Sequence, residues 1–291
     1  MFVELLQFLL SGVTIGSIYA LVALGFSIVF NASGVINFAQ GEFVMLGGVA
    51  AVTLVEAGVS LPFAVMLAVA IAGVVGLLVE KLAIEPAKDA DEVTLIIITI
   101  GASLTIRGMV QVLFGKGAHV LPSFGGDKPL RVLGATILPQ SLWVLGTTLS
   151  VVLMLAGFFG KTLLGKAMLA TSFNKLAAQL VGINANFVLF LAFGLSAVLG
   201  ALGGVIIAPI TYTSYDVGLM LGLKGFIAGT LGGLGSGYGA TVGGLLLGVL
   251  EALTAGYVSS AYKDALPFVL VLFILFFFPR GLFGASLTER V

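Results

Sequence analysis

The chain has 291 residues, of which 59% are hydrophobic and 9% are charged, and its formal net charge is zero. A soluble domain is typically about 45–50% apolar and about 25% charged, so this composition excludes an ordinary soluble protein. Cysteine is absent and histidine occurs once, which excludes a disulfide framework and argues against metal sites built from Cys or several His. There is no block of like charges that would indicate nucleic-acid binding.

Apolar segments fill the chain from end to end. A helix needs about 20 apolar residues to cross a hydrocarbon core about 30 Å thick. Such runs predict an all-α, polytopic membrane protein with eight or nine spans. The second run and the two runs around Gly235-Ser236-Gly237 contain Gly and polar residues, so broken or re-entrant helices are an alternative there. The runs lie near residues 5–30, 40–57, 61–84, 93–114, 141–160, 187–211, 219–235, 239–258 and 264–279.

Three polar stretches predict the orientation, at residues 81–92, at residues 161–186 and in the tail from Pro279. With nine spans, all three fall on one side of the membrane. Lys and Arg concentrate on that side, and positively charged loops remain cytoplasmic. We therefore expect the amino terminus outside and the carboxyl terminus in the cytoplasm.

Glycine recurs every four residues in two series near the end of the chain, which are Gly225, Gly229, Gly233 and Gly237, and Gly235, Gly239 and Gly243. On a helix this spacing lies on one face, where missing side chains allow the close backbone contact that holds helices together in lipid. We predict that most of these glycines pack helices, and the alternative is a thin, movable wall around a conduit. Similar series occur in residues 12–20 and 196–208. The residues assigned to packing are Gly229, Gly233, Gly237 and Gly239.

Residues 31–42 form a polar stretch between two apolar runs. One alternative is a plain cytoplasmic turn. The other is an unwound section at membrane depth, which survives only where protein or a water-filled cavity covers it. The stretch has no Lys or Arg, and Glu42 already lies inside the next apolar run. Both observations favour the unwound section.

Ionisable side chains also occur within the predicted spans. A charge at mid-helix costs about 2.5–3.5 kcal/mol on insertion scales, so it should face a partner or water. Glu56, Glu80 and Lys224 lie near predicted helix ends, and we expect them at the membrane surface. Arg107 and Glu251 lie deeper, and they either pair with each other or line a polar path. Proton-coupled carriers usually need a chain of buried acids and histidines, and this sequence offers few of them.

The chain has no phosphate-binding Walker loop. The nearest approach is GFFGKT at residues 157–162, where Leu155 occupies the position that requires the first Gly. If transport is driven by ATP, the nucleotide site must lie in another subunit. An intramembrane enzyme needs a nucleophile and a base, and this chain has no cysteine and one histidine, which lies in a predicted outer loop. We therefore expect no catalytic residue and no metal ligand in this chain.

Several segments resemble the LivH-type permeases of branched-chain amino-acid ABC importers. They are GSIYAL at 16–21, GVINFAQGE at 34–42, the glycine-rich residues 229–244 and the ending PRGLFG at 279–284. The resemblance covers nearly the whole chain and implies one transmembrane permease domain over residues 1–291, in the bacterial cytoplasmic (inner) membrane. It implies a non-catalytic, channel-forming subunit for branched-chain amino acids or a related solute. Relatives of this type also transport urea, amides and aromatic carboxylates.

The same resemblance implies the partners. They are a second permease of the LivM type, two ATPase subunits that hold ATP and Mg, and an extracytoplasmic solute-binding protein. The chain itself would hold no cofactor. The different class of function that we retain is a secondary transporter or channel that works without ATPases.

In such permeases a cytoplasmic loop carries a short coupling helix that docks on the ATPase. Residues 161–186 resemble this loop, with the sequence KLAAQLVGI at 175–183. Lys175 lies at the membrane surface, Ala177 and Ala178 allow close docking, and Gly182 ends the helix. The family often has a basic residue near position 169 and polar residues near 173, which this chain lacks.

We assign a polar, mobile region near the translocation path to four residues of the amino-terminal motifs. They are Tyr19, Asn37, Gln40 and Glu42.

Overall fold

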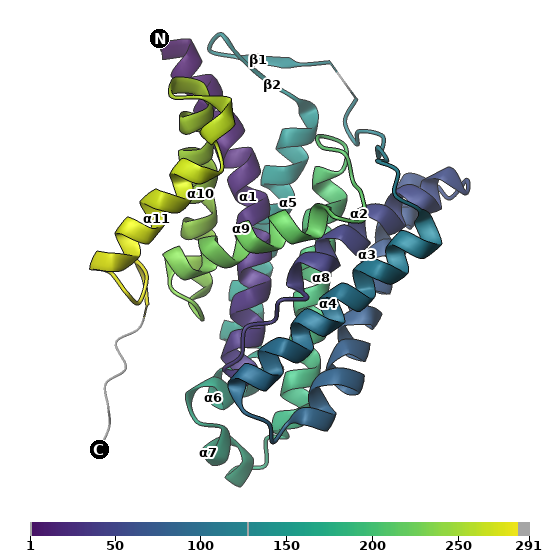
Figure 1. Cartoon of the computed structure of the whole chain (residues 1–291), viewed down its shortest axis with the longest axis vertical. Coiled ribbons are helices and arrows are strands. Elements are labelled where there is room, and N and C mark those ends of the chain that lie inside the picture. Colours follow the sequence, from purple (N-terminus) through teal and green to yellow (C-terminus); the bar gives the residue numbers. More distant parts are fainter. Residues whose placement is uncertain (1, 127, 285–291) are drawn as a thin grey trace.

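The computed structural model describes residues 2–126 and 128–284, and nearly all of its regular structure is helical (Figure 1). A short antiparallel hairpin, in which Leu130 pairs with Ile137, is the sheet of the described chain. The elements are α1 (Phe2–Ser33), α2 (Gln40–Glu56), α3 (Leu61–Val79), the π-helical turn η1 (Glu80–Ile84), the 3-10 turn η2 (Glu85–Ala87), α4 (Glu92–Phe114), β1 (Leu130–Val132), β2 (Ala135–Ile137), α5 (Pro139–Lys161), α6 (Leu163–Phe173), α7 (Lys175–Leu180), α8 (Ala185–Ile207), α9 (Val217–Gly232), α10 (Gly237–Tyr257), the 3-10 turn η3 (Ser260–Tyr262) and α11 (Ala265–Phe277).

The predicted all-α class with several membrane spans is confirmed. Among the described residues, six helices are long and apolar enough to cross a membrane: α1, α3 with its continuation to residue 87, α4, α5, α8 and α10. The other three predicted runs also form helices, but α2 has 17 residues, α9 has 16 and α11 has 13. The count of eight or nine full crossings therefore does not follow from helix length.

Helix α1 forms the centre of the molecule. It runs between α10 on one side and α8 on the other, and the short helix α9 crosses it (Figure 1). From Gly16 to Val29 every residue of α1 is buried. Helix α2 is buried in turn against α3, α8 and α9. The amino-terminal motifs thus lie in the interior of the fold.

Glycines bring these central helices into backbone contact. A Cβ atom added at Gly248 of α10 would lie 2.3 Å from the amide nitrogen of Gly16 in α1. A Cβ atom at Gly204 of α8 would lie 1.8 Å from the carbonyl oxygen of Val44 in α2. Neither distance leaves room for a side chain, so the packing role predicted for the series in residues 12–20 and 196–208 is confirmed.

The predicted series through Gly225, Gly229, Gly233 and Gly237 does not form one helical face, and this expectation was wrong. Helix α9 ends at Gly232 and α10 begins at Gly237. Between them Gly233 and Gly235 adopt φ values of +102° and +88°, which L residues rarely adopt. The glycines therefore form a tight turn between α9 and α10.

The four glycines assigned to packing differ in their surroundings. Gly239 meets Gly232 across the α9–α10 turn, where an added Cβ would lie 2.3 Å from the Gly232 carbonyl oxygen. Gly233 is a turn residue. At Gly229 and Gly237 the nearest atoms would be 3.4 and 3.9 Å away, which is ordinary contact. Close helix packing therefore explains Gly239 but neither Gly229 nor Gly237.

The polar stretches at residues 81–92 and 161–186 lie at the same end of the molecule, opposite the start of α1 and the β1–β2 hairpin (Figure 1). This agrees with their predicted placement on one side.

At that end Asp91 precedes α4, and a hydrogen bond from the Thr94 hydroxyl lowers the pKa of the Asp91 carboxyl. At the opposite end the backbones of His119 and Thr213 exchange two hydrogen bonds.

The glycine contacts predict that substitution by leucine destabilises the protein at a helix crossing but not at an open position. Gly248→Leu should lower the free energy of unfolding by about 1–3 kcal/mol, because the side chain must force α1 and α10 apart. Gly101→Leu in α4 is the matched control, since no atom lies within 4 Å of its Cβ position. Thermal unfolding in detergent measures both variants. Equal midpoints for the two would contradict the role of Gly248.

Candidate functional site

The polar stretch after α1 is buried inside the protein. Helix α1 ends at Ser33, Gly34 adopts φ +74°, and α2 begins only at Gln40. Asn37, Gln40 and Glu42 are 1%, 0% and 1% exposed. Of the two alternatives, the burial of these side chains agrees with the non-helical section that the protein covers, and not with a plain turn.

Local hydrogen bonds satisfy the backbone of this section. The Asn37 side chain accepts a bond from the Ala39 amide at 3.0 Å, and the Phe38 amide donates to the Thr99 hydroxyl of α4 at 3.2 Å. The Asn37 Nδ2 atom is buried without a described partner. Asn37 thus shapes the entry into α2, since backbone groups at membrane depth need internal partners.

A buried ion pair joins α2 to α4. The Arg107 guanidinium contacts the Glu42 carboxylate, and Ser103 Oγ donates to the same oxygen at 2.9 Å. The pairing of Arg107 with Glu251 that the sequence suggested is wrong. Helix α4 packs on α2, whereas α10 packs on α1.

A second charged network surrounds Lys224 in the middle of α9. Its Nζ atom lies 2.9 Å from Glu251 and 2.6 Å from Asp264, and it donates to the Tyr19 hydroxyl at 3.1 Å. The Tyr19 hydroxyl donates to Glu251 at 2.7 Å. The expected surface position of Lys224 is therefore wrong: α9 begins at Val217, and the Lys224 side chain is 9% exposed.

Helix α9 connects the two networks. A Cβ atom at Gly41 would lie 2.1 Å from the Gly218 carbonyl oxygen, and one at Gly222 would lie 2.8 Å from the Gly41 Cα atom. The start of α9 therefore rests directly on the start of α2, beside Glu42. Lys224 follows within the next turn. Any displacement of α9 would disturb both charged groups.

Gln40 ties three helices together. Its Nε2 donates to the Ser196 carbonyl at 3.0 Å, and the Ser196 hydroxyl contacts the Gln40 amide and donates to the Gly25 carbonyl at 3.0 Å. A Cβ atom at Gly25 would lie 2.1 Å from Gln40 Nε2. Gln40 thus fills the space that the absent side chain of Gly25 leaves between α1 and α8.

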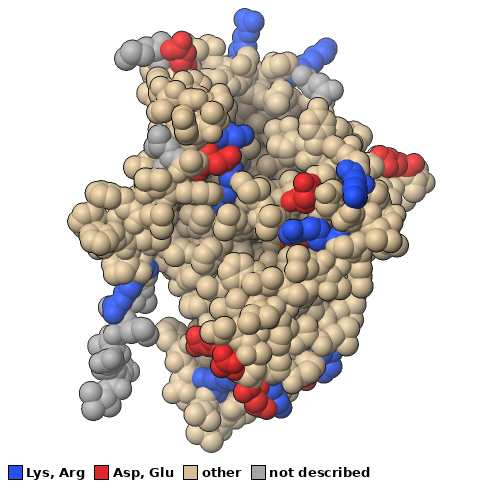
Figure 2. Space-filling view, in the orientation of Figure 1, with Lys and Arg blue, Asp and Glu red and all other residues tan. Residues whose placement is uncertain are grey.

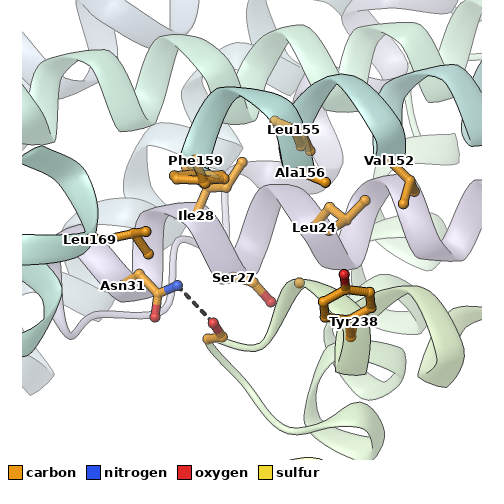
Figure 3. A pocket seen from close by; sticks show the side chains of 12 residues that line it. Leu24, Ser27, Ile28, Asn31, Val152, Leu155, Ala156, Phe159, Leu169 and Tyr238 are labelled. Atoms are coloured by element: carbon orange, nitrogen blue, oxygen red, sulfur yellow. Dashed lines mark hydrogen bonds between the residues drawn. The ribbon is translucent and has the colours of Figure 1, made fainter. Parts of the chain in front are cut away.

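A pocket of about 320 Å³ lies between α1, α5, α6 and the α9–α10 turn (Figure 3). Leu24, Ile28 and Phe159 are among its apolar lining residues. Asn31 Nδ2 donates to the Gly235 carbonyl at 2.8 Å, while the buried Ser27 hydroxyl has no partner among the described residues. Sequence patterns did not reveal this pocket, because α1 lies more than 100 residues away in the sequence from the other segments that form its walls.

The segment resembling a coupling loop contains the short helix α7, as predicted. Asn174 caps its first turn by accepting from the Ala177 amide at 3.0 Å. Gly182, at φ +90°, donates to the Gln179 carbonyl and ends the helix, as expected.

Ala178 is only 3% exposed, so it packs against its own chain and the expected close docking through this residue is wrong. Lys175 and Ala177 are exposed. The outward apolar residues are Phe173, Leu176, Leu180 and Val181, which are 88%, 74%, 87% and 77% exposed.

Comparison with known proteins identifies the family. Residues 8–275 match the model of the family described as the permease component of the branched-chain amino acid transport system. The chain belongs to this permease family. It is 33% identical to the high-affinity branched-chain amino acid transport system permease protein LivH of Salmonella typhimurium, over 100% of this chain and 99% of the relative. BraD of Pseudomonas aeruginosa is 32% identical over 98% of each chain.

A solved structure shares the fold of this permease. A chain of PsaBC from Streptococcus pneumoniae, solved in complex with Fab, aligns with a TM-score of 0.50 at 16% identity, over 96% of this chain and 94% of that one. At this identity the likeness concerns the fold alone.

The motifs that carry the family resemblance converge on α9 of the permease. Residues 34–42 contact its first turns, and residues 229–244 form its end and the turn into α10. The ending at 279–284 joins them, since Leu282 and Phe283 donate backbone hydrogen bonds to Leu231 and Gly232 at 2.8 and 2.9 Å. Their convergence was not visible in the sequence.

The buried ion pair of the permease predicts strong coupling between two substitutions. Arg107→Met should cost about 3–5 kcal/mol, because it leaves the buried Glu42 carboxylate without its cationic partner, and Glu42→Gln should cost less, because Arg107 is partly exposed. The double variant should lose clearly less stability than the sum of the losses in the two single variants. Lys224→Met belongs to the other network, so with Glu42→Gln it should be closer to additive. Unfolding in detergent measures the stability of each single and double variant. Additive losses for Glu42→Gln and Arg107→Met would contradict the predicted coupling.

Proposed function

We propose that this permease is the channel-forming membrane subunit of an ATP-binding-cassette importer in the bacterial cytoplasmic (inner) membrane. The observation that carries the proposal is the full-length similarity to LivH. The subunit is a single transmembrane domain over residues 1–291, non-catalytic, with its amino terminus outside and its carboxyl terminus inside. The concentration of Lys and Arg on one side supports this orientation.

The solute that we propose is a branched-chain amino acid or a related small molecule, delivered by an extracytoplasmic binding protein. LivH and BraD are named for the transport of branched-chain amino acids. Urea, amides or aromatic carboxylates are the alternative solutes. An apolar pocket with the polar groups of Ser27 and Asn31 at its wall suits a solute with an aliphatic part.

A second, LivM-type permease completes the path in this proposal. Figure 2 shows Lys, Arg, Asp and Glu side chains midway along the face on which α4 and α9 lie, as well as at both ends of the molecule. The Arg107 side chain is 18% exposed and that of Asp264 is 36% exposed. Charges that face lipid at mid-depth are costly. This face is therefore suited to border the second permease and the path, close to Tyr19, Asn37, Gln40 and Glu42.

Two ATPase subunits, with ATP and Mg, drive transport in this proposal. Residues 161–186 form the coupling loop, and α7 docks on an ATPase. The four exposed apolar side chains around α7 support this role, because an apolar cluster outside the helix bundle favours a protein partner. Lys175, Ala177 and Gly182 belong to this surface, whereas Ala178 anchors α7 to its own bundle.

The proposed function predicts that uptake requires ATP. The chain would be co-purified with its partner subunits and placed in liposomes with leucine as the probe. Leucine uptake should depend on ATP and on the binding protein. Stable, ATP-independent uptake by the isolated subunit would overturn the proposal and favour the secondary transporter.

The coupling role predicts that Gly182→Val uncouples transport. A β-branched residue is strained at φ +90°, so the end of α7 must rearrange while the spans remain unchanged. Uptake per ATP hydrolysed should fall several-fold, with normal insertion into the membrane. Gly157→Val in α5 is the control, because no atom lies within 4 Å of its Cβ position. Unchanged uptake and ATP hydrolysis in Gly182→Val would refute the assignment.

A further inference from the structure

A groove of about 650 Å³ lies between the end of α3 and the start of α8, away from the charged networks around α9. Its walls change character along the helices. Val74, Leu77 and Phe190 line the part that lies farther along α3 and α8 toward the middle of the molecule. Polar residues line the part at the end that carries α6 and α7, and they are Glu80, Lys81, Glu85, Asn184 and Asn186. An apolar channel that ends in polar groups matches a lipid rather than a small polar solute.

The groove follows from the way in which α3 and α8 pack. The two helices are in close contact at Gly76, where an added Cβ would lie 2.4 Å from that of Ala197. Beyond this contact, helix α3 continues as the π-helical turn η1, in which the Glu85 amide donates to the Glu80 carbonyl. A π turn inserts an extra residue into a helix and is frequent at functional sites. Here it begins at Glu80, beside the groove.

Glu80 is a buried carboxylate that lacks a hydrogen-bond donor. The residue is 2% exposed, and within the described parts of the chain no donor bonds to its side chain. The neighbouring cation, Lys81, is engaged with Glu85 at 2.5 Å. The three side chains together carry a net charge of −1. A carboxylate in this position is stabilised by a cation, and the cation beside it, Lys81, is shared with Glu85.

Hydrogen-bond donors occupy the exposed edge of the same groove. The Lys81 side chain is 60% exposed. Asn184 caps α8 with its Oδ1 atom, which accepts from the amides of Asn186 and Phe187 at 3.1 Å. Its NH2 group and the Asn186 side chain therefore remain available to an acceptor. A ligand that carries a cation close to an anionic oxygen group fits both parts of this polar end.

We propose that the groove binds one phospholipid with a primary-amine headgroup, of the phosphatidylethanolamine type. The ammonium group pairs with Glu80, the phosphate accepts from Lys81 and the two asparagines, and an acyl chain lies along Val74, Leu77 and Phe190. The site requires that the chain spans a membrane, but not that it transports any particular solute. Because Asn184 also ends the α7–α8 connection, the lipid would contact the base of the proposed coupling loop.

The test compares lipid binding in nanodiscs made of phosphatidylcholine with either phosphatidylethanolamine or phosphatidylglycerol as the minor component. The full chain is extracted and its bound lipids are counted by native mass spectrometry. About one phosphatidylethanolamine per chain should be retained, with at least tenfold preference over phosphatidylcholine, since a charge-assisted hydrogen bond to Glu80 is lost with a quaternary amine. Preference for phosphatidylglycerol, or no preference, would overturn the proposal.

Variants separate Glu80 from general lipid binding. Glu80→Gln should abolish the preference for phosphatidylethanolamine, whereas Glu56→Gln, at an exposed carboxylate at the opposite end, should retain it. Asn186→Asp changes an exposed residue and should weaken retention by placing a negative charge beside the phosphate, which keeps the test valid if Glu80→Gln fails to fold. Retention that is unchanged in both Glu80→Gln and Asn186→Asp would refute the site.

Discussion

Direct contact between helix backbones is the constraint on which the rest of this structure depends. Lipid provides no hydrophobic force between helices, so they are held by van der Waals contact and internal polar bonds. Glycines meet this need where α1 crosses α10 at Gly248 and where α8 crosses α2 at Gly204. At Gly41 the contact lies between α2 and α9. These crossings fix the backbone positions that bring buried polar side chains within bonding distance.

The buried charges depend on this framework and also limit how it can move. Glu42 and Arg107 hold α2 to α4, while Lys224 holds α9 to α1, α10 and the start of α11. Helix α9 contacts both groups, and the carboxyl-terminal motif bonds to its last turn. In an importer with alternating access, the permease would have to move α9 without leaving either network unpaired in a low-dielectric interior. A rigid unit that includes α9 and its partners meets this condition.

Predictions from the sequence succeeded where they rested on local properties and failed where they needed a neighbour. A covered section after residue 34 was the alternative that the sequence favoured over a plain turn, because the stretch has no Lys or Arg and Glu42 lies inside the next apolar run. The partner of Arg107 was not, because pairing depends on which helices are adjacent. Ala178 was placed on the wrong face of α7, since six residues show too little periodicity to indicate which side is buried. Lys224 lay near the end of an apolar run but in the middle of its helix.

The sequence by itself determined the class of protein: apolar runs of helical length, few charges and the motifs around residues 37 and 233 are local, and they suffice to identify a helical membrane permease of this family. Tertiary structure alone decided that these motifs meet at α9, that the glycine series breaks into a turn, and that Glu80 faces an amphipathic groove. The physical reason is that periodicity records which face of a helix is apolar. It does not record which other helix that face contacts, and ion pairs, pockets and grooves are all properties of such contacts.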